Sequence, residues 1–161
     1  MTLEKIQLKR LKLSDPMVGI SIRQAPPHLN VKEALCRVFA KHGVNQTFIS
    51  SRHADGRDAV FCCLIAAEHN KAKQLLDQTI PSAYPLYRII PSVTLLSVFP
   101  HRSDIGLVCQ LLQVLWEAQI PVYAIASSIA ALTLVVDTDR ITQTVAALEK
   151  CIGIQSEGGL N

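Results

Sequence analysis

Apolar runs and amphipathic stretches alternate along the first half of the chain. The apolar run at residues 17–23 is typical of a strand, and apolar positions within residues 31–39 recur at helical spacing. His42-Gly43 follows that stretch, and glycine is common directly after a helix. The predicted elements are strands at 17–23, 44–51 and 59–65, with an Asp55-Gly56 hairpin turn, and helices from 31 to the stop at 42–43 and from about 68 to 78.

The same order of elements restarts at Val93. The predicted elements of this second copy are strands at 93–99, 120–127 and 131–137, a helix at about 105–118, and a final helix capped by Asp137 or Thr138. The almost continuous apolar character of residues 120–127 is typical of a strand that is buried on both sides. Two units of this order predict an α+β fold, in which each antiparallel sheet carries both of its helices on one face.

Each predicted sheet needs a fourth strand. Residues 84–90 can supply it to the first unit, whereas the second unit is followed only by a short Gly-rich segment. We therefore hypothesise that the N-terminal segment, Lys5 to Leu13, crosses over to complete the second sheet. The expected domain organisation is residues 1–13 as this strand, 14–91 as the first unit and 92–161 as the second.

Charge is concentrated at the N-terminus. The chain holds 16 basic and 13 acidic side chains, and residues 1–13 hold four of the former and one of the latter, so the remainder balances at 12 against 12. A neutral body offers no basic face for several phosphate contacts, so we expect no nucleic-acid partner. No run of 18 apolar residues is present, so we expect no membrane association and a cytoplasmic location.

The cysteines and histidines do not form a pattern that binds metal. The five cysteines include no C-x-x-C pair and have mostly apolar neighbours, which predicts reduced thiols in the core. Cys62 and Cys63 are adjacent in a strand, so their side chains should point to opposite faces of the sheet. The five histidines are scattered singly, and we expect neither a metal site nor a cofactor.

The second copy resembles the regulatory ACT unit of aspartokinases. The likeness rests on an ordered combination: a strand at 93–99, a D-x-G turn at Asp104 that opens a helix, an A-x-I-P-V strand entry at residues 118–122, and a Ser127-Ser128 turn. ACT-type resemblance covers residues 17–80 and 93–152. It implies two ferredoxin-like βαββαβ modules of the small ligand-sensing kind attached to many enzymes of amino-acid metabolism.

The resemblance also implies a function. No Gly-rich phosphate loop is present, and 161 residues leave no room for a kinase domain, so we expect a free-standing, non-catalytic regulatory or sensor protein rather than an enzyme. Its expected partners are an amino-acid ligand, with lysine or threonine suggested by the aspartokinase likeness, a second copy in a homodimer, and an enzyme under allosteric regulation.

In the ACT family the effector usually lies between the loop after the first strand and the start of the second strand of a neighbouring module. Here the loop leads into a helix N-terminus, where backbone N–H groups attract a carboxylate, while Asp104 is suited to an ammonium group. Carbonyl groups of the facing strand entry complete the expected site. The candidate ligand-binding residues are Ser103, Asp104, Ile105, Gly106, Leu107, Ile120, Pro121, Val122, Ser127 and Ser128.

Structural interpretations of the same residues stay open. Asp104 is equally suited to be an N-cap that accepts hydrogen bonds from the Gly106 and Leu107 amides. The hydroxyls of Ser127 and Ser128 are equally suited to close a hairpin turn through local hydrogen bonds. Trp116 and Tyr123 are interpreted as core or interface residues rather than as ligand contacts. In the first copy, the loop at residues 24–30 has Pro26-Pro27 and neither glycine nor acid, so we expect the ligand in the second unit.

Two other functions are compatible with a ferredoxin-like fold. An RNA-binding module needs aromatic side chains on its central strands, and residues 59–65 and 131–137 contain only Phe61. An enzyme needs a nucleophile beside a base, and the only dense polar cluster, His101 to Asp104, consists of consecutive loop residues. Both alternatives are therefore weaker than amino-acid sensing.

Overall fold

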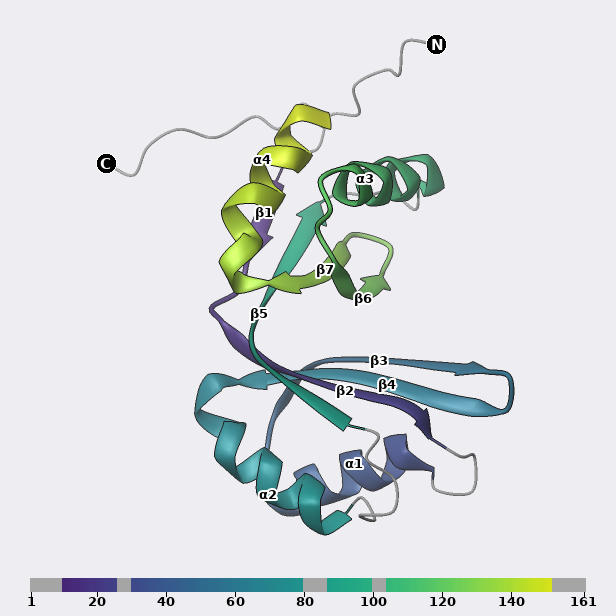
Figure 1. Cartoon of the computed structure of the whole chain (residues 1–161), viewed down its shortest axis with the longest axis vertical. Coiled ribbons are helices and arrows are strands. Elements are labelled where there is room, and N and C mark those ends of the chain that lie inside the picture. Colours follow the sequence, from purple (N-terminus) through teal and green to yellow (C-terminus); the bar gives the residue numbers. More distant parts are fainter. Residues whose placement is uncertain (1–9, 26–29, 80–86, 100–103, 152–161) are drawn as a thin grey trace. The chain divides into compact units, whose positions relative to one another are not determined.

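The structure is a computed structural model, and it describes residues 10–25, 30–79, 87–99 and 104–151. Strands and helices alternate along the chain much as their hydrophobic periodicity predicts (Figure 1). The elements are β1 (Arg10–Leu13), β2 (Met17–Ala25), α1 (Val31–Lys41), β3 (Gln46–Ala54), β4 (Arg57–Ile65), the 3-10 helix η2 (Ala66–Glu68), α2 (His69–Thr79), β5 (Tyr87–Phe99), α3 (Ile105–Glu117), β6 (Val122–Ser127), β7 (Leu132–Asp137), the 3-10 helix η3 (Thr138–Arg140) and α4 (Ile141–Cys151).

The chain forms two compact units. The first unit is Pro16–Val93, and the second unit combines the described residues before Pro16 with those from Thr94 onward. In each unit an antiparallel sheet carries two helices on one face (Figure 1). The α+β prediction with two ferredoxin-like modules is therefore confirmed.

The first unit has the strand order β3-β4-β2-β5. Alternate residues of β2 and β4, such as Ile20 and its partner Cys62, point toward α1 and α2. From the helices, Leu35, Phe39 and Leu76 meet them, each at most 1% exposed. A period of two on the strands and a period of 3.6 on the helices thus build one core.

The second unit has the strand order β1-β5-β7-β6. β1 lies antiparallel to β5, with Leu11 opposite Val98, and the amide of Ser14 donates to the carbonyl of Leu95 at 3.0 Å. Residues 10–13 thus occupy the sheet position that the N-terminal hypothesis assigned to this segment, while residues 5–9 lie outside the described residues. The core joins Leu107, Leu111, Leu115 and Leu148 to the apolar positions of the sheet.

β5 corrects the prediction of two separate strands at 84–90 and 93–99. It is one strand, which pairs with β2 up to Val93 and with β1 from Leu96 onward. Pro91 lies inside it, and the register with β2 shifts between Met17 and Gly19, opposite the proline. Proline lacks an N–H group, and a bulge is where a strand accommodates it.

The entry into α4 also differs from the prediction. A side-chain cap at Asp137 or Thr138 was expected, but η3 precedes the helix and Asp137 makes no side-chain cap bond. Its carboxylate instead accepts a hydrogen bond from the Tyr123 hydroxyl at 2.9 Å. The Asp137 carboxylate, which the local sequence pattern predicted to cap the helix, therefore accepts from a residue of the neighbouring strand instead.

Of the cysteines whose side chains the structure describes, two are buried and two are exposed. Cys62 and Cys63 are fully buried, and burial raises the pKa of each thiol to about 12. Cys62 belongs to the core under α1 and α2 whereas Cys63 does not, as strand alternation predicts. Cys36 and Cys109 are exposed, so the prediction of core thiols is wrong for both. No helix in the described part of the chain is long and apolar enough to cross a membrane.

This division predicts thiol reactivity. Near pH 8 an alkylating reagent should label Cys36 and Cys109 and spare Cys62 and Cys63, because only thiolates react and burial suppresses their formation. Above the ordinary thiol pKa of 9.0, unfolded thiols ionise while the buried pair stay protonated, so the free energy of unfolding should fall as pH rises toward 12. Mass mapping of native and denatured protein measures the labelling. Labelling of Cys62 at the rate of Cys36 would contradict this burial.

Candidate functional site

Asp104 is the N-cap of α3. One carboxylate oxygen, Oδ1, accepts hydrogen bonds from the amides of Gly106 at 2.8 Å and Leu107 at 3.2 Å. The Asp104 carbonyl accepts a third, from the amide of Val108 at 3.3 Å. The first amides of a helix have no preceding helical turn to supply carbonyl acceptors. The Asp104 carboxylate therefore satisfies donors that have no acceptor within the helix.

The two carboxylate oxygens of Asp104 are not equivalent. Oδ1 makes both capping bonds, whereas Oδ2 has no hydrogen bond among the described residues. The residue is exposed. The capping role and a ligand-binding role are therefore compatible, because one oxygen holds the helix while the other is open to a cation.

The remaining candidates near the helix start differ in accessibility. Ile105 is 74% exposed and Gly106 is exposed, so both are open to a ligand. Leu107 is fully buried in the core, and its amide is bound to Asp104. Ser103 lies outside the described residues, as do His101 and Arg102.

The strand-entry candidates lie at the opposite end of α3. Ile120 is buried and donates its amide to the carbonyl of Leu115 at 2.8 Å, while Pro121 is exposed and Val122 is half-buried. α3 has 13 residues, which corresponds to about 20 Å of helix. Since Asp104 precedes this helix and Ile120 follows it, a single unit does not bring the two groups together.

Ser128 closes the β6–β7 hairpin. Its amide donates to the carbonyl of Ala131 at 2.8 Å, and its hydroxyl accepts from the Ala131 amide at 3.1 Å. This geometry accounts for Ser128 as a turn residue. Ser127 is the exposed last residue of β6, opposite Leu132 in β7.

Two expectations about packing are corrected. Trp116 is 83% exposed, so it is not a core residue of this chain. β6 is an edge strand whose residues are half-buried up to Ala126, so it is not buried on both sides. Helical spacing contained the signal for Trp116: it repeats with Ile105 and Leu112, whereas the core positions repeat as Leu107, Leu111 and Leu115.

Features required by other functions are not supported by the described residues. No group of three or more His, Cys, Asp or Glu side chains in the described ranges is arranged to hold a metal ion. Phe61, the aromatic residue of β4, is only 7% exposed. Base stacking needs an open aromatic face, so Phe61 does not offer one.

Removing the cap should destabilise the second unit. Asp104→Ala is expected to lower the free energy of unfolding by about 1 kcal/mol, because the Gly106 and Leu107 amides lose their acceptor. Asp104→Asn should retain most of the stability, since its amide oxygen replaces Oδ1. Urea unfolding measures both, and Asp15→Ala, an exposed acid in the same unit, is the control. An equal loss in Asp104→Ala and the control would contradict the capping role.

Comparison with known proteins identifies the fold. No family model matches the sequence, and no curated protein matches it. Among solved structures, the aspartokinase alpha and beta subunits align over 89% of this chain and 97% of that chain, with a TM-score of 0.77 and 15% identity. The regulatory subunit of aspartate kinase from Thermus flavus aligns over 90% and 98%, with a TM-score of 0.76 and 13% identity.

A full-length kinase gives a narrower match. E. coli aspartokinase III in complex with lysine and aspartate aligns over 94% of this chain but 34% of that chain, with a TM-score of 0.63 and 15% identity. The alignment with the Thermus flavus regulatory subunit, by contrast, spans nearly all of both chains. The chain therefore has the tandem ACT fold of the aspartokinase regulatory region.

Proposed function

We propose that the protein is a non-catalytic regulatory protein that binds an amino acid. The observation that carries this proposal is the alignment with an aspartate kinase regulatory subunit over nearly the full length of both chains. The same fold covers only about a third of a full-length aspartokinase, so the similarity is to its regulatory part. An enzyme of amino-acid metabolism is the partner that such a module would regulate.

The chemistry at the start of α3 supports an amino-acid ligand. Oδ2 of Asp104, which has no hydrogen bond within the described part of the chain, suits an ammonium group, because a charged hydrogen bond is stronger than a neutral one. Gly106 has no side chain, so a ligand can approach the backbone there. Lysine is the first candidate, since the structurally similar E. coli aspartokinase III forms a complex with lysine and aspartate.

The proposed site is composite. Asp104 and the strand entry at Ile120 to Val122 are separated by the length of α3, about 20 Å. A free amino acid is much shorter than this, so it cannot contact both groups of one unit. We infer that a neighbouring module supplies the strand entry, with Pro121 exposed beside it, to the Asp104 end. Ser103, Ile105, Leu107, Ser127 and Ser128 are the further candidates of the site.

Thermal denaturation with each of the twenty amino acids tests the proposal. A ligand at about 100 times its dissociation constant should stabilise the folded protein by about 2.7 kcal/mol, because it binds only the folded state. Lysine is expected to be among the stabilising amino acids. No stabilisation by any of the twenty would overturn the proposal.

A charge-neutral variant tests the site separately from the fold. Asp104→Asn keeps an oxygen for the Gly106 and Leu107 amides but replaces the carboxylate that would bind the ammonium group. We expect its affinity for the stabilising amino acid to fall by about tenfold or more. Asp15→Asn removes the same charge elsewhere in the second unit and should bind normally. Unchanged affinity in Asp104→Asn would place the ligand elsewhere.

A further inference from the structure

Each strand of the first sheet carries one arginine. These are Arg23 in β2, Arg52 in β3, Arg57 in β4 and Arg88 in β5, and all four are exposed. The lysines of the same unit, by contrast, all lie in α1 and α2. Arginine differs from lysine in its planar fork, which binds a phosphate or carboxylate group through two parallel hydrogen bonds. The sheet therefore gathers the basic side chain that is best suited to bind an anion.

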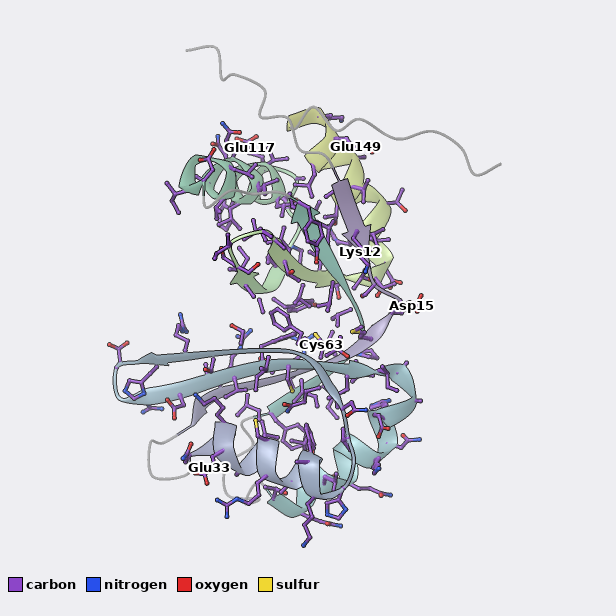
Figure 2. All side chains as sticks on the ribbon, turned by 180° about the vertical axis from the view of Figure 1, so that it is seen from behind. Lys12, Asp15, Glu33, Cys63, Glu117 and Glu149 are labelled. Atoms are coloured by element: carbon purple, nitrogen blue, oxygen red, sulfur yellow. The ribbon has the colours of Figure 1, made fainter. Side chains whose placement is uncertain are left out.

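The strand register places these arginines on one face of the sheet. Val60 of β4 belongs to the core under α1 and α2, so its neighbour Ala59 points to the other face. Arg52 of β3 is paired with Ala59 and points the same way. Arg57 lies two residues before Ala59 and shares its face of β4. Figure 2 labels Cys63, four residues further along β4, on this side of the sheet, away from the helices.

Arg23 reaches the same face from β2. The register between β2 and β4 shifts between Ile22 and Ala25, so Arg23 lies in a bulge opposite Ala59. It follows Ile22, whose side chain is in the core, and so points away from the helices. Adjacent strands are about 4.8 Å apart, so the backbones of Arg23 and Arg52 flank Ala59 at about 10 Å from each other. The methyl group of Ala59 is too short to separate the two guanidinium groups.

Arg88 adds a further strand to this face. It is paired with Ser21 of β2, which lies between the core residues Ile20 and Ile22 and therefore points away from the helices. Ser21 is two residues from Arg23, so Arg88 and Arg23 are diagonal neighbours at about 7 to 8 Å. The turn between β3 and β4, the end of β2 and the start of β5 lie at the same end of the unit (Figure 1). We call this surface the arginine face and define it by Arg23, Arg52, Arg57 and Arg88.

The acidic residues of the first unit do not neutralise the arginine face. Four of the five lie within ion-pair distance of a basic side chain elsewhere: Glu33 of Arg37, Asp58 of His53, Glu68 of Lys71 and Asp77 of Lys73. The fifth, Asp55, lies in the turn between β3 and β4. The segments 26–29 and 80–86, which adjoin β2 and β5 in the chain, contain no acidic residue.

Three of the arginines have no ion pair within the described part of the chain, namely Arg23, Arg52 and Arg88. Arg57 already interacts with another group, so the inference rests on the other three. Like charges on neighbouring strands of one face repel each other. An anion that binds between these side chains removes that repulsion. The balance of charge over residues 14–161 thus conceals a basic face.

We propose that the arginine face binds a small anion with two or more linked phosphoryl groups, the chemistry of tripolyphosphate or of the phosphate chain of a nucleotide. Arg23 and Arg52 hold one phosphoryl group over Ala59, and Arg88 holds the next. This inference does not depend on the proposed amino-acid site, since Asp104 belongs to the second unit.

The number and kind of side chains select this ligand. Arginines that are spread over about 10 Å need more than one anionic group to bind them all. Linked phosphoryl groups supply such a series, and each matches the arginine fork. A nucleic-acid site uses about six to ten phosphate contacts or stacks bases on aromatic side chains. Four arginines are fewer than this, and Phe61 of the same sheet is too buried to stack.

Isothermal titration calorimetry with tripolyphosphate at about 50 millimolar salt tests the proposal. Wild type should bind it at least about tenfold more tightly than orthophosphate, because a second phosphoryl group reaches another arginine. Arg23→Gln and Arg52→Gln should each weaken binding by about tenfold or more. Arg52→Lys keeps the charge without the fork and should recover only part of the affinity. Arg37→Gln removes the same side chain from α1 and should bind like wild type.

Thermal denaturation without ligand separates a binding role from a structural one. Arg23→Gln and Arg52→Gln should be at least as stable as wild type, because each removes repulsion from the arginine face. Loss of stability in both variants would assign the arginines to the fold and contradict the proposal. Asp104→Asn should bind tripolyphosphate normally, which separates this site from the amino-acid site.

Three results of the calorimetry would overturn the proposal. They are no binding of tripolyphosphate, an affinity no higher than that for orthophosphate, and an affinity unchanged in both glutamine variants. A single-stranded oligonucleotide provides the comparison with a nucleic acid. If it binds where tripolyphosphate does not, the arginine face serves a nucleic acid and the proposal fails.

Discussion

The pairing of backbone groups at sheet edges is the constraint on which this architecture depends. In the second unit, the strands contributed by residues 94–137 leave two edges, β5 and β6. β1 pairs with β5 and becomes the outer strand on that side of the sheet, and it carries the exposed Lys12. Part of the basic charge at the N-terminus thus lies on an edge strand, where it discourages further pairing. β6 is the edge that charge leaves unprotected.

Asp104 illustrates how one side chain serves structure and is available for binding. Oδ1 caps α3, and the helix N-terminus needs such an acceptor whatever the protein binds. Oδ2 is bound to none of the described residues, so a cation can approach it without disturbing the cap. Loss of ligand binding in an alanine variant would therefore be ambiguous, whereas asparagine separates the two roles.

The proposed site depends on a second module. A ligand that contacts both Asp104 and a strand entry like that at Ile120 needs a second module, because α3 separates these two residues of one unit by about 20 Å. A ligand that binds such a composite site would stabilise the assembled form over the separated one, and this differential affinity is the basis of allosteric regulation.

Local patterns in the sequence were sufficient for the order of elements, the two copies and the core stripes. Leu107, Leu111 and Leu115 follow helical spacing, and Cys62 and Cys63 alternate on a strand, so the face on which each side chain lies follows from its local position. The Asp104 cap was likewise available as one of two interpretations, because its partners are two and three residues distant.

Tertiary structure decided the features that depend on distant partners. The sequence alone did not show that Pro91 would lie in a bulge of one long β5, because that depends on pairing with β2. Asp137 was expected to cap α4, but its carboxylate accepts a hydrogen bond from the Tyr123 hydroxyl of the neighbouring strand. β6 is apolar in sequence, but only the strand order places it at an edge of the sheet. Periodicity determines which residues share a face of an element, whereas long-range pairing determines whether that face is covered.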